Sequence, residues 1–259
     1  MTLLSPDIED LRTAKRLLET PGLAARISNL VGGPVEKGFA MLPGKWNALV
    51  NDATRKSIAT ALDVALWTMH HAQAEAPSNW WHKLAIGTTG AAGGAFGLPA
   101  LAIELPVSTT IMLRSIADIA RSEGESLAAP EGKLACLEVF ALGGRRPNDN
   151  ATESAYFAVR GVLAKAVSEA AQFITEKGLV EEGAPALVRL VAQVASRFGA
   201  AVSEKVAAEA VPIVGAAGGA AINLLFIDHF QDMARGHFIV RRLERTYGAA
   251  LVRAEYDRV

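Results

Sequence analysis

Hydrophobic positions recur along the chain at intervals of three and four residues, and no stretch alternates apolar and polar residues with a period of two. The first spacing places apolar side chains on one face of an α-helix, whereas strict alternation would indicate a strand. Alanine, leucine, glutamate and arginine dominate, and these residues favour helix. We therefore predict an all-α protein. The predicted helices are 5–20, 23–30, 45–74, 107–122, 130–142, 151–177, 186–198, 200–210 and 215–247, with a short charged tail behind the last.

Two prolines interrupt the uncharged stretch 84–103 and the segment that follows it, namely Pro99 and Pro106. Proline removes a backbone donor and clashes with the preceding turn of a helix. We therefore expect a helical hairpin, or two helices joined near Gly97, instead of one straight helix. The helix that starts at Val107 should stop at Gly124, a glycine placed to end it.

A glycine- and alanine-rich unit occurs twice. Residues 90–95 and 215–220 both read Gly-Ala-Ala-Gly-Gly-Ala, and each copy precedes a helical segment that ends Arg-x-x-Gly. From first to last glycine the distance is 34 residues in one copy and 33 in the other. The matching pattern indicates an internal pseudo-repeat. We predict N-terminal helices over 1–44 and a single multi-helix domain with one core over 45–259.

Each unit also carries two glycines four residues apart, Gly90 with Gly94 and Gly215 with Gly219. On a helix such a pair lies on one face and lets another backbone approach closely. The pairs fit dense packing in a soluble core, and they also fit insertion into a membrane. The stretches 84–103 and 210–227 are about long enough to span a bilayer. The six strongly apolar side chains of the first contribute only about −2 to −3.5 kcal/mol to insertion, so we expect segments that are buried in one state and reach lipid in another.

Aromatic and basic residues accompany both units. Their arrangement resembles the belt that anchors proteins at a membrane interface. The alternative is that the aromatic side chains pack in the core and the arginines lie on a solvated helix face. The interface candidates are Trp80, Trp81, Lys83, Phe96, Phe238, Arg241 and Arg242.

The charge balance excludes one class of partner. The chain has 26 basic and 27 acidic residues and a net charge of −1, so it lacks the electrostatic footprint of a nucleic-acid binder. The single cysteine, Cys136, lies in an apolar run and is expected to be a small buried hydrophobe. A chain with one cysteine cannot form an internal disulfide, and this fits a reducing compartment. The N-terminus does not read as a secretory signal, so we expect a cytoplasmic protein.

The sequence contains no phosphate-binding, dinucleotide-binding, nucleophile-elbow or metalloprotease motif, and we expect no cofactor. Several polar residues do lie in apolar surroundings. Under the repeat alignment Glu104 falls opposite His229, and a carboxylate beside an imidazole would hold a metal or perform acid–base chemistry. The alternative is a set of interhelical hydrogen bonds and ion pairs. The candidates are Glu104, Arg114, Asp118, Asn223, Asp228, His229 and Asp232.

Several short motifs resemble the EcsC family. They span about residues 46–248 and are Gly97-Leu98-Pro99, Pro106, Leu113-Arg114-Ser115-Ile116-Ala117 ending at Gly124, Ile213-Val214-Gly215, Asn223, Arg242-Leu243-Glu244 and Tyr247-Gly248. The resemblance implies a bacterial protein linked to ABC exporters, because the family is named for a protein encoded beside one. Some members carry a protease-like label, but this sequence offers no catalytic set to match it.

We therefore expect a non-enzymatic accessory or binding protein, cytoplasmic and membrane-associated or peripheral to the inner membrane. Its partners would be a lipid or other hydrophobic ligand, a membrane surface or a membrane protein. One alternative is a soluble helical carrier of a hydrophobic ligand. The other is a metal-dependent hydrolase that uses the acids and histidine of the polar set, namely Glu104, Asp118, Asp228, His229 and Asp232.

Overall fold

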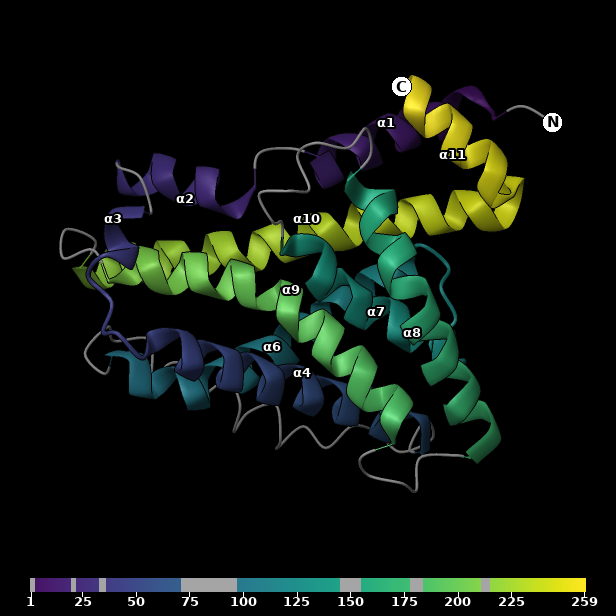
Figure 1. Ribbon diagram of the computed structural model, residues 1–259. Coiled ribbons are helices and arrows are strands. Elements are labelled where there is room, and N and C mark those ends of the chain that lie inside the picture. The colour runs from purple at the N-terminus through teal and green to yellow at the C-terminus, as the bar shows by residue number, and fades with distance from the viewer. Residues whose placement is uncertain are drawn as a thin grey trace.

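The computed structural model describes residues 3–19, 22–32, 36–70, 97–144, 155–177, 184–210 and 215–259. In these residues every regular element is a helix and there is no strand, which confirms the predicted all-α class (Figure 1). The helices are α1 (Ser5–Glu19), α2 (Leu23–Val31), α3 (Glu36–Phe39), α4 (Trp46–His70), α6 (Gly97–Ser122), α7 (Pro130–Gly143), α8 (Ala155–Lys177), α9 (Pro185–Glu209), α10 (Gly215–Tyr247) and α11 (Ala249–Arg258).

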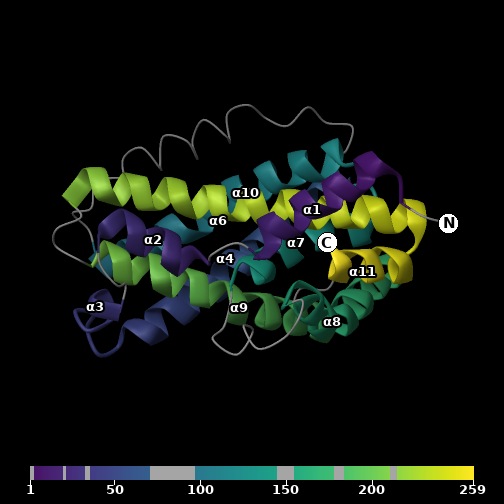
Figure 2. The same cartoon turned by 90° about the horizontal axis from the view of Figure 1, so that it is seen from above.

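The long helix α10 runs through the length of the fold, as the two views show (Figures 1 and 2). It contacts α1, α2, α6, α7, α9 and α11. Helix α4 packs on α6, α7 and α9, and α8 packs on α7 and α9. The N-terminal helices α1 to α3 lie against α9 and α10, so they share one hydrophobic core with the rest of the chain.

Phenylalanine side chains from three helices fill the centre of that core. The ring of Phe198 on α9 lies 5.1 Å from Phe140 on α7 and 5.3 Å from Phe230 on α10. These edge-to-face contacts add to the free energy gained by burying the rings. Gly143, at the end of α7, makes room for them, because a Cβ atom there would lie 2.3 Å from the ring of Phe230.

Helices α6 and α10 run parallel to each other. The Gln231 side chain of α10 donates a 2.9 Å hydrogen bond to Ser115 of α6. Ten residues further along α10, Arg241 binds Glu125, which lies ten residues beyond Ser115. The second glycine- and alanine-rich unit opens α10, whereas the first lies outside the described residues, so the pseudo-repeat stays a prediction.

Three predicted boundaries are wrong. Pro106 lies inside α6, where the residue four positions earlier, Ala102, is exposed, so its unpaired carbonyl can bond to water. Helix α9 continues through Gly199, because the burial of Phe198 and Val202 outweighs the roughly 1 kcal/mol that a glycine costs. The charged tail is helix α11, which buries one face against the fold through Val252 and Tyr256.

Other boundaries are confirmed. Helix α10 covers Gly215–Tyr247 as predicted, and Gly248 behind it has a φ of +87°. Gly124 ends α6 with a φ of +72°, a left-handed conformation that glycine adopts without strain.

The expected close helix contact at Gly219 is wrong. A Cβ atom there would meet no heavy atom within 4 Å. The close approach on α10 is instead at Gly236, where a Cβ atom would lie 2.6 Å from Leu18 Cγ and 3.0 Å from the carbonyl oxygen of Ala14 on α1. Gly90 and Gly94 lie outside the described residues.

Within the described ranges, α9 alone has the length and apolar composition of a membrane-crossing helix. Of its apolar stretch, 56% is buried inside the fold. The core helix of a soluble protein can have the same length and composition. These two properties therefore do not distinguish a core helix from a membrane-crossing helix.

Candidate functional site

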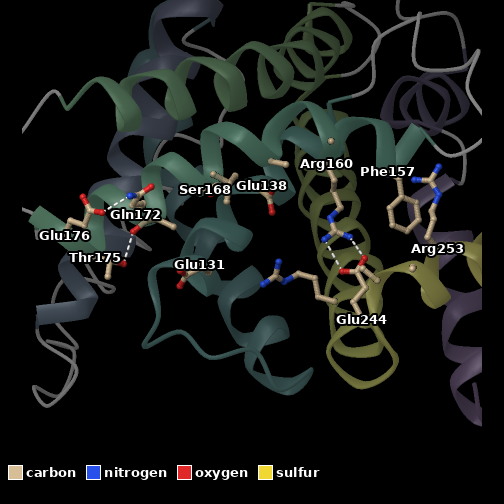
Figure 3. A pocket seen from close by; sticks show the side chains of 17 residues that line it. Glu131, Glu138, Phe157, Arg160, Ser168, Gln172, Thr175, Glu176, Glu244 and Arg253 are labelled. Carbon is tan, nitrogen blue, oxygen red and sulfur yellow. Dashed lines mark hydrogen bonds and ion pairs between the residues drawn. The ribbon is translucent and has the colours of Figure 1, made fainter. Parts of the chain in front are cut away.

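An open groove of about 970 Å³ lies between α7, α8, α10 and the start of α11 (Figure 3). Small and apolar residues of α8 form its wall, among them Gly161, Ala164, Val167 and Ala171. Charged residues of α7, α8 and α10 gather at its other side, chiefly Glu138, Arg160, Arg241 and Glu244. The groove therefore offers an apolar wall beside a polar floor.

The sequence of α8 explains why the groove stays open. Its larger apolar residues, such as Leu163 and Ile174, point into the core. The face toward the groove carries mainly glycine, alanine and serine at helical spacing, and these are too small to fill the space in front of them. From Gly161 to Thr175 this face extends about 21 Å at 1.5 Å per residue.

Hydrogen bonds connect the polar side chains of the floor. Arg160 donates to the Tyr156 hydroxyl at 3.3 Å and to both carboxylate oxygens of Glu244 at 2.8 and 3.0 Å. The Tyr156 hydroxyl lies 3.0 Å from Nδ1 of His237. Because a guanidinium only donates, the hydroxyl accepts from Arg160 and gives its own proton to Nδ1. Neutral His237 then carries its proton on Nε2.

The Nε2 atom of His237 faces Glu138. It lies 3.9 Å from Oε2 of the carboxylate, which is longer than a hydrogen bond. Glu138 is only 4% exposed and receives no hydrogen bond within the described part of the chain. Burial raises the pKa of Glu138 to about 7, although Arg160 and Arg241 oppose the shift. Burial lowers the pKa of His237 well below its usual value, so the imidazole is neutral at pH 7.

A second ion pair closes the floor from the loop between α6 and α7. Arg241 donates to both oxygens of Glu125 at 3.0 and 2.8 Å, and Arg245 binds the same carboxylate. Burial raises the pKa of Glu125, but the hydrogen bonds and charges of the two arginines outweigh it, and the net pKa is lowered. Glu125 is therefore ionised and holds both arginines in place.

Residues 6–243 match the model of the EcsC protein family, which covers most of the chain. The protein belongs to the EcsC family. No curated protein and no solved structure matches the chain. The family match begins inside α1 and ends inside α10, so the N-terminal helices of this EcsC protein lie within the matched region, whereas Glu244 and the α11 residues of the groove lie beyond it.

In this EcsC protein the predicted polar candidates do not form one site, and those that are paired have different partners. Glu104 pairs with buried Lys205 at 2.8 Å, and Asp118 pairs with Arg121 at 2.6 Å. A third acid, Asp232, pairs with Arg26 at 3.0 Å and with Arg235 at 3.2 Å. Across the described ranges, no three histidine, cysteine or acidic side chains form a group that could hold a metal ion.

The remaining polar candidates are also separate. His229 is buried, and its Nε2 donates to the carbonyl oxygen of Gly143 at 2.9 Å. The Oδ1 atom of Asn223 is buried and has no hydrogen-bond partner, whereas Arg114 and Asp228 are exposed. In this structure Glu104, Asp232 and His229 make interhelical contacts, as the structural alternative expected.

The interface candidates divide into two groups. Trp80, Trp81, Lys83 and Phe96 lie outside the described residues. The other three make internal contacts: Phe238 is fully buried, Arg241 binds Glu125, and Arg242 binds Asp10 and Glu123 at 2.7 and 2.8 Å. Cys136 is buried as predicted, and burial raises its pKa to about 12.

Large apolar side chains are exposed in both stretches that were predicted to reach lipid. Ile103 on α6 is 77% exposed, and Leu224 on α10 is 62% exposed. On the other side of α10, Ile222 and Phe226 are buried. Leu224 therefore places one large apolar side chain on the solvent side of α10, one turn before the exposed Asp228.

Sequence patterns did not reveal the residues of the groove floor or those that bind behind them. Glu138, Arg160 and Glu244 line the groove, and buried Tyr156 and His237 contact them from behind. One signal was present: Glu138 is the only charged residue between Lys133 and Arg145. A single acid in an otherwise apolar run predicts a buried carboxylate with a specific neighbour.

Proposed function

We propose that this EcsC-family protein is a non-enzymatic binding protein that works at or beside the bacterial inner membrane, as an accessory to a membrane protein of the exporter type. The exposure of Ile103 and Leu224, in the two stretches predicted to contact lipid, carries the proposal. Burying such a side chain contributes about 1.5–3 kcal/mol, so two of them favour contact with an apolar surface.

The position of Leu224 on α10 supports this function. A surface helix normally keeps polar residues on its solvent side. The core covers Ile222 and Phe226, whereas Leu224 on the opposite side is 62% exposed. A lipid surface would cover it.

Flotation with phospholipid vesicles tests the proposal. The Ile103→Glu, Leu224→Glu double variant places two charges where contact is expected, and it should lose at least tenfold in vesicle binding. The matched control is Val162→Glu with Val188→Glu, on α8 and α9, where the native side chains are 63% and 53% exposed. The control should float as the native protein does. Equal binding by both double variants, or no binding by the native chain, would contradict the proposal.

A second function is favoured by the groove. Its apolar wall and polar floor suit a carrier that holds one amphipathic molecule, since ligand sites combine apolar walls with a few placed polar groups. Mass spectrometry of small molecules released from purified protein tests a carrier, which should release a stoichiometric ligand.

The hydrolase alternative has a separate test. Purified protein is analysed for metal, and Glu104→Ala and His229→Ala are compared with the native chain in cells. Bound metal, and loss of function in both variants, would support hydrolysis over binding.

A further inference from the structure

The charges that line the groove are not balanced. Each arginine has its own carboxylate: Arg160 pairs with Glu244, Arg241 with Glu125 and Arg253 with Asp257. Three glutamates on the lining, Glu131, Glu138 and Glu176, have no cation within ion-pair distance in the described part of the chain. The groove therefore has an excess of negative charge.

Glu138 is the buried member of this acidic set. Its carboxylate lies on the groove floor with no hydrogen bond from any described residue. A buried ionised group without a partner is less stable than a paired one, so an added hydrogen-bond donor there would bind favourably. The neighbouring Nε2 of His237 is fully buried, has no hydrogen-bond partner and faces the same carboxylate.

The wall beside Glu138 suits an apolar body. Ala164, Val167 and Ala171 of α8 line the groove, and Phe157 closes the end nearest α11. Arg253 stacks on Phe157 with its guanidinium 4.3 Å from the ring centroid, which fixes the position of that ring.

We infer that the groove binds a small amphipathic organic cation, with its ammonium group on the Glu138 carboxylate and its apolar body along α8. The inference rests on the carrier function and names its ligand class. An ammonium supplies the donors that Glu138 lacks and neutralises the unpaired charge. The two nearby guanidiniums oppose a cation only weakly, because Glu244 and Glu125 offset their charges.

The pH dependence of binding follows from the groups that face Glu138. These are Tyr156 and Arg160 on α8, and His237, Arg241 and Glu244 on α10. His237 is neutral at pH 7, and Tyr156, Arg160 and Arg241, whose pKa values are all raised, keep their charge state between pH 6 and pH 8. Glu138, with a pKa of about 7, titrates in this range. An alkylammonium stays charged below about pH 10, so its affinity should rise about tenfold from pH 6 to pH 8.

Isothermal titration calorimetry of the full chain with three probes tests the inference. Octylammonium, octanol and octanoate share one apolar body and differ in head charge. At pH 8 octylammonium should bind at least tenfold more tightly than octanol, and octanoate more weakly than both. Glu138→Gln should remove the advantage of octylammonium over octanol and its pH dependence. Glu9→Gln removes an exposed carboxylate of α1 outside the groove, so it is the matched control and should keep both.

The outcomes separate this inference from the carrier function. Equal binding of octylammonium and octanol keeps the carrier and overturns the cationic ligand. Tighter binding of octanoate, or an unchanged preference in Glu138→Gln, also overturns it. If none of the probes binds to folded protein, both proposals fail. Circular dichroism of each variant shows whether the fold is retained, and octanol binding by Glu138→Gln shows that its groove is intact.

Discussion

The Nε2 atom of His237 lies 3.9 Å from Oε2 of Glu138, and both side chains are buried. Tyr156 fixes the imidazole through Nδ1, so the proton on Nε2 faces the carboxylate without reaching it. The pair thus carries one neutral ring and one acid of raised pKa, and its charge changes with pH through Glu138.

Glu138→Gln should change how stability depends on pH. The folded-state pKa of Glu138 is about 7, above the unfolded value of 4.5, so the native chain loses stability as the pH rises through 7. The amide does not titrate. The stability of the variant relative to the native chain should therefore rise by about 3 kcal/mol between pH 4.5 and pH 8. Urea unfolding of both proteins at the two pH values measures this difference, and Glu176→Gln is the control for removing a groove carboxylate.

Tyr156→Phe should destabilise the fold by about 1–3 kcal/mol, because it leaves Nδ1 of buried His237 without its hydrogen bond. Tyr247→Phe is the matched control, since it removes a hydroxyl that binds Asp7 in a partly exposed position. Tyr247→Phe should lower the free energy of unfolding by less than Tyr156→Phe does. Equal unfolding midpoints in denaturant for the two variants would show that the buried hydrogen bond contributes no more stability than the partly exposed one.

The ion pair of Arg160 with Glu244 should have a measurable coupling energy. It is bidentate and mostly buried, with distances of 2.8 and 3.0 Å. A double-mutant cycle with alanine should give about 1–3 kcal/mol. The same cycle on Arg121 and Asp118, an exposed pair 2.6 Å apart, should give less than about 1 kcal/mol. A larger coupling for the exposed pair would contradict the role of burial.

Two glycines of α10 should respond to alanine in opposite ways. Gly219→Ala meets no atom within 4 Å and should stabilise the protein by about 0.5–1 kcal/mol, as alanine does in open helix positions. Gly236→Ala would place a methyl group 2.6 Å from Leu18 Cγ and should destabilise the contact between α1 and α10. Thermal unfolding of the two variants compares them. A destabilised Gly219→Ala would instead point to close packing at that glycine.

Local signals predicted most of the helices, and they failed where tertiary packing opposed them. Gly215 and Gly248 mark the two ends of α10 in the sequence, and the helix has those bounds. Pro106 and Gly199 also read as breaks, yet both lie inside helices. Their neighbours Leu105 and Phe198 are buried in the core, and that burial outweighs a local preference of a few kcal/mol.

The groove was beyond the reach of sequence patterns because three distant segments build its floor. Glu138, Arg160 and Arg241 belong to α7, α8 and α10, and no periodicity relates positions on different helices. The candidates that the repeat alignment placed opposite each other, Glu104 and His229, instead bind Lys205 and Gly143. The packing of the helices determines which polar side chains meet. The distances between side chains on different helices cannot be derived from the pattern of a single sequence.

Helix α10 is one unbroken rod of 33 residues, about 50 Å long. Leu224 lies near its beginning, and Arg241 and Glu244 on the groove floor lie near its end, about 26 Å further on. No loop between them can absorb a movement. If Leu224 contacts a lipid surface as proposed, a tilt of α10 imposed there would also move Arg241 and Glu244, and the proposed surface contact and the proposed ligand site would be mechanically coupled.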